Sequence, residues 1–296
     1  MAASHLWQIS VRTSVEAEEA IAALFERLFA RSPSIYIDAE TQATDVSIFC
    51  PQRPKRAAQL RSGLEQIQAF GLNISPGKII TRKVRREDWA ESWKKHFKPL
   101  EISHALLVKP SWSRRRPRAG QAVVVLDPGL SFGTGQHPTT AFCLEQLVAH
   151  RQAGQPQSFL DIGTGSGILA IAAAKSGYSP IQAFDFDPAA IRTARANATL
   201  NNVLKHVRIF RRDLTRLPLR SVMKFDVICA NLIDDLLIAQ SKRIMNRLQP
   251  DGTLVVAGIL QVQFDRIRLA FADAGLRLVA TRVKREWQSG AFAAKR

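Results

Sequence analysis

Three closely spaced glycines in the middle of the chain mark a place where a small molecule could bind. Gly163, Gly165 and Gly167 lie in FLDIGTGSGILAIAA, residues 159–173, after a short apolar run that contains Asp161. Glycine lacks a Cβ, so the backbone can take positive φ and a ligand can approach closely. The alanine-rich segment that follows has helical composition, and a helix start offers unpaired N–H groups. We therefore predict a strand, a tight turn and a helix, with a ligand bound at the turn.

An acidic residue further along the chain indicates that this ligand contains a nucleoside. Asp185 follows the apolar run 181–184 and lies 22 residues after Gly163. An acid at the end of the second strand of such a fold is placed to accept hydrogen bonds from ribose hydroxyls. Asp187 and Pro188 come next and are typical of a helix cap and a first helical residue.

Two nucleoside cofactors fit the glycine spacing, and the surrounding residues favour one of them. Gly165, Gly167 and Ala170 satisfy the dinucleotide pattern in its variant ending in alanine. However, no constellation suited to hydride transfer follows Asn231. The compact G-x-G-x-G turn, the acid followed by Asp-Pro, and Asn231 after the apolar run FDVICA (225–230) favour S-adenosylmethionine. We therefore predict methyl transfer rather than redox chemistry.

A glycine- and hydroxyl-rich loop precedes the turn. It reads DPGLSFGTGQHPTT, residues 127–140, and ends on His137, Thr139 and Thr140 before an apolar helical segment. The threonines could be helix caps and His137 an ordinary loop residue. A polar loop of this length is nevertheless uncommon unless it folds over something.

The elements around these residues predict an α/β domain over residues 120–296. Apolar runs at 122–126, 159–162, 181–184, 207–210, 225–229 and 253–260 alternate with helical segments. Such alternation with short connections is typical of a doubly wound parallel sheet. Gly163, Asp185 and Asn231 would then lie together at the carboxyl end of the sheet.

The residues before this domain predict a smaller α+β domain and a connection. Over 1–86 the order of patterns is βαββαβ, which indicates a ferredoxin-like module. Residues 87–119 are expected to form a linker helix, with an aromatic stripe in EDWAESWKKHFKPL (87–100), and a basic loop. The stripe is interpreted mainly as a packing seam.

Charge and composition bound the partners and the compartment. The net charge is +17, and residues 51–120 hold 17 Lys and Arg against five Asp and Glu. This basic segment would suit RNA, and equally a plain solvated surface. Cys50, Cys143 and Cys229 lack metal-ligand spacing, and there is no membrane-length apolar run. We expect no metal, no membrane partner, a cytoplasmic location and a monomer.

These motifs resemble the methyltransferases of large-subunit ribosomal protein eleven. The resemblance rests on DPGLSFGTGQHPTT, LDIGTGSGILAIAA, DFDPAAI, ANL and AGIL, in that order. It implies a Rossmann-like class I methyltransferase domain preceded by a substrate-recognition domain and a linker helix. It also implies methylation of lysine side chains and the N-terminal amine of a ribosomal protein. Thr140, Gly163, Asp185 and Asn231 match the family's cofactor-binding positions, and Gly165 belongs to the same turn.

The segment after Asn231 departs from the family pattern, which usually has small residues and a proline there. Here Ile233, Asp234 and Asp235 intervene before Leu236. This segment should border the acceptor, so another protein lysine or RNA stays an alternative acceptor, as does a non-catalytic module that senses a nucleoside and binds RNA. No catalytic residue is assigned. Asn231 could orient the amine or the cofactor, and His137 is a conceivable base.

Overall fold

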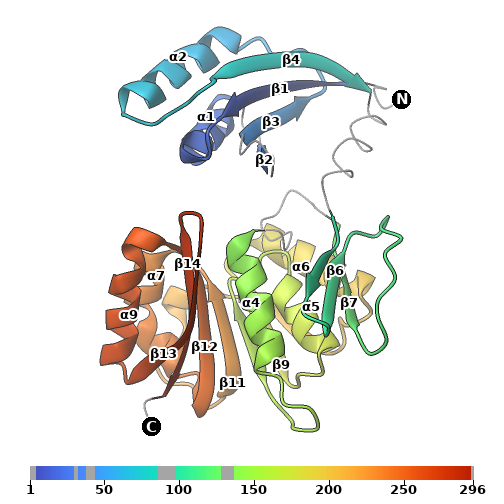
Figure 1. Ribbon diagram of the computed structural model, residues 1–296, viewed down its shortest axis with the longest axis vertical. Coiled ribbons are helices and arrows are strands. Elements are labelled where there is room, and N and C mark those ends of the chain that lie inside the picture. The colour runs from blue at the N-terminus through green and yellow to red at the C-terminus, as the bar shows by residue number, and fades with distance from the viewer. Residues whose placement is uncertain (1–4, 30–32, 38–43, 86–97, 128–136, 295–296) are drawn as a thin grey trace. The chain divides into compact units, whose positions relative to one another are not determined.

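The chain divides into two compact units. The computed structural model describes residues 5–29, 33–37, 44–85, 98–127 and 137–294 (Figure 1). The first unit spans Met1–His96 and the second Phe97–Arg296. Each unit has a hydrophobic core of its own.

The first unit is an antiparallel sheet with two helices. Its elements are β1 (His5–Thr13), α1 (Glu18–Phe29), β2 (Ser34–Ile37), β3 (Thr44–Cys50), α2 (Ala57–Ala69) and β4 (Lys78–Arg85). The strand order is β2-β3-β1-β4, and every pairing is antiparallel. The predicted βαββαβ order and the ferredoxin-like fold are thus confirmed.

One face of this sheet packs against both helices. Alternate residues of the strands point into the core, as Ile9 and Ile48 do, and they meet Phe25 of α1. Gly63 lets α2 come close to α1, since a Cβ at this position would lie 2.5 Å from Leu24 Cδ1. The apolar residues that alternate along the strands therefore pack against those that recur at helical spacing in α1.

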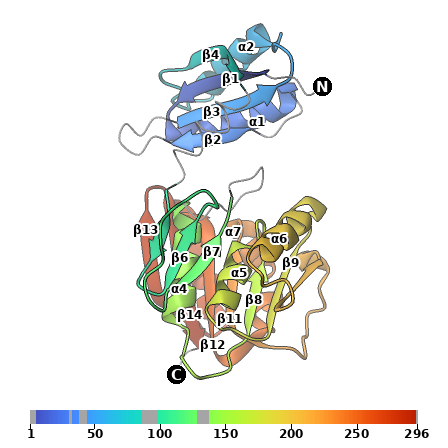
Figure 2. The same cartoon turned by 90° about the vertical axis from the view of Figure 1, so that its right-hand side faces the viewer.

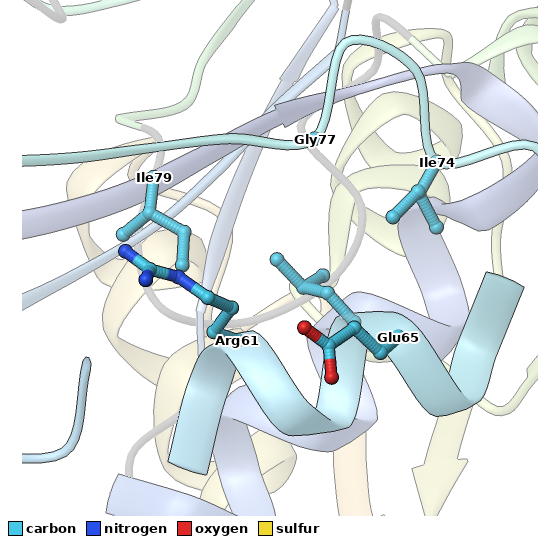
Figure 3. A pocket seen from close by; sticks show the side chains of 6 residues that line it. Arg61, Glu65, Ile74, Gly77 and Ile79 are labelled. Carbon is cyan, nitrogen blue, oxygen red and sulfur yellow. The ribbon is translucent and has the colours of Figure 1, made fainter. Parts of the chain in front are cut away.

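A small pocket lies between α2 and the segment that leads into β4. Its volume is about 220 Å³. Figure 3 shows Arg61 and Glu65 on α2, with Ile79 of β4 and Ile74 across from them. The pocket thus combines apolar walls with one cation and one carboxylate.

The second unit is built on a seven-stranded sheet. The strands are β8 (Phe159–Ile162), β9 (Ile181–Asp185), β10 (Val207–Arg211), β11 (Phe225–Asn231), β12 (Leu248–Leu260), β13 (Leu276–Lys284) and β14 (Trp287–Ala294). Their order is β10-β9-β8-β11-β12-β14-β13. The first five are parallel, as predicted, and β14 runs antiparallel to both neighbours.

Helices cover both faces of this sheet. They are α4 (Pro138–Ala149), α5 (Ile168–Lys175) and α6 (Pro188–Leu200) on one face, and α7 (Asp234–Ala239), α8 (Ser241–Met245) and α9 (Phe264–Asp273) on the other. Phe159 and Leu160 are consecutive in β8 but belong to the two opposite cores. Strands buried on both faces are apolar at nearly every position, which explains the near-continuous apolar runs.

The structure contains strands that the sequence analysis did not predict. β5 (Leu100–Ile102) pairs with β6 (Leu106–Lys109), and β6 pairs with β7 (Ala122–Val125), in a separate three-stranded sheet. We had expected a linker at the first two strands and had placed the run 122–126 in the main sheet. The predicted helix at 87–100 falls mostly on residues 86–97, outside the described residues. β13 and β14 were also missed, because exposed arginines and lysines interrupt the apolar pattern of β13.

The basic loop 111–120 is held against the short sheet by its own charges. Arg118 Nη2 lies 3.1 Å from Glu101 Oε2, and Arg115 forms a second ion pair with the same carboxylate. The hydrogen bond from Arg115 lowers the pKa of Glu101. Lys109 Nζ donates to the carbonyl oxygen of Arg115 at 2.9 Å. Part of the positive charge in this segment is therefore engaged in ion pairs and hydrogen bonds within the second unit.

Candidate functional site

The glycine turn connects β8 to α5 and lies against the segment that follows β11. Gly163 has φ +72°. A Cβ there would lie 2.6 Å from Leu232 Cδ2, so only glycine fits without a shift. The amides of Gly163 and Thr164 both donate to the carbonyl oxygen of Phe184 at 3.0 Å. The predicted strand, turn and helix are confirmed, and the turn is joined to the end of β9.

Asp185 forms a direct hydrogen bond to the turn. Its Oδ2 accepts from the Gly165 amide at 3.0 Å, and its Oδ1 accepts from the Asp187 amide at 3.0 Å. The residue is 9% exposed. A carboxylate oxygen can accept more than one hydrogen bond, so both oxygens keep acceptor capacity for ribose hydroxyls. Gly163, Gly165 and Asp185, which the sequence singled out separately, are thus brought together.

Asp161 holds the turn from inside and was not singled out in the sequence. Its Oδ2 accepts from Thr164 Oγ1 at 2.6 Å and from the Ala170 amide at 3.3 Å. Burial raises the pKa of this carboxyl to about 7. The polar residue at the third position of an otherwise apolar strand was the available signal. Asp161 is a positioning residue, since it fixes the turn to the first part of α5.

Asn231 ends β11 and meets the start of α4. Its Nδ2 lies 3.4 Å from Thr139 Oγ1. Gly258 of β12, at φ +82°, passes beside the same amide, and a Cβ there would lie 2.9 Å from Asn231 Oδ1. Strands β9, β8 and β11 are neighbours and parallel (Figure 2). Asn231, Gly163 and Asp185 come at or directly after the carboxyl ends of these strands, so they lie at the same end of the sheet.

Thr140 and His137 lie at the N-terminus of α4. Thr140 is 1% exposed, and its hydroxyl has no hydrogen-bond partner among the described residues. His137 Nδ1 lies 2.7 Å from Thr139 Oγ1, and its ring meets Trp287 edge-on with centroids 5.1 Å apart. Burial lowers the pKa of His137, so the imidazole is neutral at pH 7. Residues 128–136 of the predicted loop lie outside the described residues.

An exposed aromatic residue borders the same edge. Phe186 directly follows Asp185 and is 70% exposed. The Arg211 guanidinium donates to its carbonyl oxygen at 3.0 Å, which ties this segment to β10. A flat apolar ring of this kind can stack on a purine. The sequence analysis passed over Phe186, although an aromatic residue between two aspartates was a visible signal.

The segment after Asn231 begins α7 without a proline. Asp234 has a side chain 7% exposed and pairs with Arg266 at 3.0 Å, and Asp235 pairs with the same guanidinium at 3.2 Å. Ile233 is 67% exposed. These residues place one apolar side chain and a partly neutralised pair of carboxylates next to Asn231.

Among the described residues, no group of three or more histidines, cysteines or acids could hold a metal ion. Nor does any helix in the described ranges have the length and apolar character needed to cross a bilayer.

Comparison with known proteins identifies the family. The family model described as ribosomal protein L11 methyltransferase (PrmA) matches residues 5–295. The chain belongs to this family. An L11 methyltransferase of Alkaliphilus metalliredigens is 34% identical over 254 residues, which cover 85% of this chain and 78% of that protein. Another from Caldanaerobacter subterraneus is 36% identical over 230 residues, or 78% of this chain and 72% of that protein.

A solved structure supports the same assignment. The ribosomal protein L11 methylase of Lactobacillus delbrueckii is 29% identical, with a TM-score of 0.60, and the match covers 68% of this chain and 100% of that one. As a member of the L11 methyltransferase family, the chain is an enzyme that uses S-adenosylmethionine as its methyl donor. The buried hydroxyl of Thr140, which no described residue hydrogen-bonds, and the spare acceptor capacity of Asp185 fit such a cofactor.

Proposed function

We propose that this enzyme transfers methyl groups from S-adenosylmethionine to amino groups of ribosomal protein L11, both lysine side chains and the N-terminal amine. The match of the family model across residues 5–295 carries the proposal. The site supports it, because one sheet edge combines the glycine turn, the Asp185 carboxylate and the Asn231 amide. When bound, the cofactor supplies an electrophilic methyl group.

The cofactor is proposed to lie over the turn. Gly163 and Gly165 let the cofactor approach the backbone, and Asp185 accepts hydrogen bonds from its ribose hydroxyls. Thr140 and Asn231 lie beside its other end. Phe186 would cover the purine. The hydroxyl of Thr140 supports this placement, because it has no partner among the residues that the structure describes and a buried hydroxyl left unsatisfied costs about 1 to 3 kcal/mol. A ligand that bonds to it removes this cost.

The acceptor amine must lose a proton before it can attack. With a reference pKa near 10.4, neutralising a lysine at pH 7 costs about 4 to 5 kcal/mol, and an α-amine near 8 costs only about 1 to 1.5 kcal/mol. Partial desolvation lowers the pKa of a lysine and supplies some of this energy. Much of the remaining rate enhancement can come from holding the amine in line with the methyl group.

A short chain of hydrogen bonds is proposed to orient Asn231 for this task. The neutral His137 accepts from the Thr139 hydroxyl at 2.7 Å, and Thr139 accepts from Asn231 Nδ2 at 3.4 Å. Because the amide nitrogen is used in this way, Asn231 Oδ1 is available to accept from the amine or the cofactor. His137 then acts as a positioning residue, and its use as a base would require breaking this chain.

The first unit is proposed to recognise the substrate, and residues 1–86 would form that domain. Of the segment 87–119 that we had expected to connect it to a catalytic domain at 120–296, residues 97–119 belong to the second unit. All candidate cofactor residues come from the second unit. The pocket lined by Arg61, Glu65 and Ile79 offers a place for a partner side chain. We further propose that the enzyme acts as a cytoplasmic monomer, and that the basic segment 51–120 contacts RNA near the substrate.

Mass spectrometry of ribosomal components tests the acceptor. Purified ribosomal proteins and ribosomal RNA are incubated separately with the enzyme and S-adenosylmethionine. We expect the mass of L11 to increase in steps of about 14 Da, one for each methyl group, at lysines and at the N-terminus. Asn231→Ala serves as the control and should reduce transfer strongly while the fold is kept. Methylation confined to RNA or to another protein would refute the proposed substrate, and full activity of Asn231→Ala would refute the role of Asn231.

A further inference from the structure

A groove lies at the opposite end of the sheet from the glycine turn. It lies where β9 and β10 begin, and its volume is about 570 Å³. Pro180 supplies exposed apolar surface, and Tyr178, Ile181 and Val207 lie buried beneath it. The register pairs Val207 with Ile181 at the amino ends of these parallel strands. Asp185 pairs with Arg211 at the other end of the same two strands, so the groove is separate from the candidate cofactor site.

Cations border this groove. Lys205, His206 and Arg208 line it together with the apolar residues, and none of its lining residues is acidic. Lys205 and Arg208 are exposed, and neither is within ion-pair distance of an acid in the part of the chain that the structure describes. The Arg208 guanidinium lies over the Phe210 ring at 5.6 Å from its centroid. This contact keeps the Arg208 guanidinium close to β10.

The positive charge continues from the groove along the edge of the sheet. β10 is an edge strand. Residues 204–224 contain seven Lys and Arg and one acid, Asp213. Asp213 pairs with Arg216 at 3.6 Å and also caps the turn at Thr215. Cations on an edge strand also keep other strands from adding to the sheet, and β13 at the other edge carries them too. At β10, however, they lead into a groove that also exposes Pro180.

We propose that this groove and the adjoining cationic edge bind single-stranded RNA. A nucleotide presents a flat apolar base and a charged phosphate, which match the exposed ring of Pro180 and the cations Lys205 and Arg208. Successive phosphates then follow β10 towards Arg211 and Arg212. The choice of RNA over an acidic peptide rests on the proposed function, because a ribosomal protein assembles with RNA.

Binding of a labelled RNA tests this proposal with a charge-matched control. The full-length enzyme is titrated into a fluorescein-labelled 12-nucleotide single-stranded RNA, and anisotropy is recorded from about 50 to 300 mM KCl. The groove variant is Lys205→Gln/Arg208→Gln. The control is Lys284→Gln/Arg277→Gln, which removes the same two residue types from the exposed β13 edge of the same sheet.

The groove variant should weaken RNA binding about tenfold near 100 mM KCl. Its log–log salt dependence should become shallower by about 1.4, since each phosphate contact on a single strand contributes about 0.7. The control should lose less than about threefold, because it leaves the groove intact. Equal losses in the two variants would overturn the proposal, since binding would then follow net charge alone.

Two further probes separate RNA from other anionic partners. Polyglutamate of similar length and vesicles of phosphatidylserine are titrated in the same way. If the groove variant no longer binds polyglutamate or the vesicles but still binds RNA, the proposal is wrong. Methyl transfer to free L11 is measured in parallel and should be unchanged in the groove variant. Loss of RNA binding with retained transfer supports the groove, whereas an enzyme that binds RNA but never methylates L11 refutes only the proposed substrate.

Discussion

At the scale of single residues, three carboxylates near the turn have different tasks. Asp161 is buried and holds the turn from inside, Asp185 faces the sheet edge, and Asp187 caps α6 by accepting from the Ala189 amide at 2.7 Å. The three are close in the fold, but their hydrogen-bond partners differ. Substitutions should therefore separate turn stability, cofactor affinity and helix capping.

Asp185→Ala should weaken binding of S-adenosylmethionine by about tenfold to a hundredfold, because hydrogen bonds to a charged group contribute about 1.5 to 3 kcal/mol. Isothermal titration calorimetry measures the change. Asp187→Ala is the matched control: it removes a neighbouring carboxylate that caps a helix, so it should cost about 1 kcal/mol of stability with little effect on cofactor affinity. Unchanged affinity in Asp185→Ala would contradict its assigned role.

Asp161→Asn should change how stability depends on pH. The raised pKa of about 7 means that the folded chain keeps a proton that the unfolded chain releases near pH 4. The free energy of unfolding therefore falls as pH rises through this window, and the loss is complete above pH 7. Asparagine does not titrate, and its carbonyl oxygen can still accept from Thr164.

Urea unfolding at pH 5 and pH 8 measures this effect. Between these values the Asp161→Asn variant should gain about 2 to 3 kcal/mol relative to the parent chain. Thr164→Ala is the control, because it removes a hydrogen bond and leaves the titrating carboxyl in place. A stability difference between Asp161→Asn and the parent that stays constant with pH would show that Asp161 does not titrate in this range.

At the scale of elements, a bulge in β12 shapes the surroundings of Asn231. β12 pairs with β11 up to Asn231 and Ala257, and its register with β14 shifts between Val256 and Ile259. Gly258 lies within this irregularity and has φ +82°. A bulge bends the strand and redirects its neighbours. Here it brings backbone beside the Asn231 amide, which leaves no room for a Cβ.

Gly258→Ala should reduce methyl transfer by more than its effect on stability explains. The new Cβ would lie 2.9 Å from Asn231 Oδ1 and would displace the amide. Gly154→Ala is a matched control, since Gly154 has φ +78° and nothing within 4 Å of a built Cβ. Both variants should lose about 1 to 2 kcal/mol through left-handed backbone. Thermal unfolding and initial rates measure the two effects, and equal activity in both variants would contradict the role of Gly258.

At the scale of the whole molecule, the two units are expected to divide recognition from chemistry. Every candidate cofactor residue belongs to the second unit, and this unit has two cores of its own on the faces of its main sheet. The first unit has a separate core between its sheet and its helices. Such units can in general fold independently.

A shortened chain of residues 97–296 should therefore bind S-adenosylmethionine within about threefold of the full enzyme. It should also methylate free L11 far more slowly, because the proposed recognition domain is missing. Calorimetry and a methyl-transfer assay separate the two outcomes, and circular dichroism establishes that the shortened chain is folded. A folded fragment with full activity on L11 would show that the first unit does not select the substrate.

Local patterns in the sequence determined the parts of this enzyme that depend on backbone geometry and strand spacing. Glycine spacing predicted the turn, and the ends of apolar runs predicted that Asp185 and Asn231 would share an edge with Gly163. The βαββαβ order followed from alternating and helical periods. These features can be read from short stretches of sequence. A turn depends on the backbone conformations that its own residues allow, and in a parallel sheet the residues that end each strand lie side by side.

Only the tertiary structure decided which side chains meet. The contact of Asn231 with Thr139 joins residues 92 positions apart, and the contact of His137 with Trp287 depends on β14 being inserted between β12 and β13. The pKa of Asp161 depends on burial by both neighbouring strands and α5, which the identity of the residue does not reveal. The groove at the start of β9 and β10 likewise arises from strand order. Packing is a property of segments distant in the chain, and hydrogen-bond chemistry at this site follows from that packing.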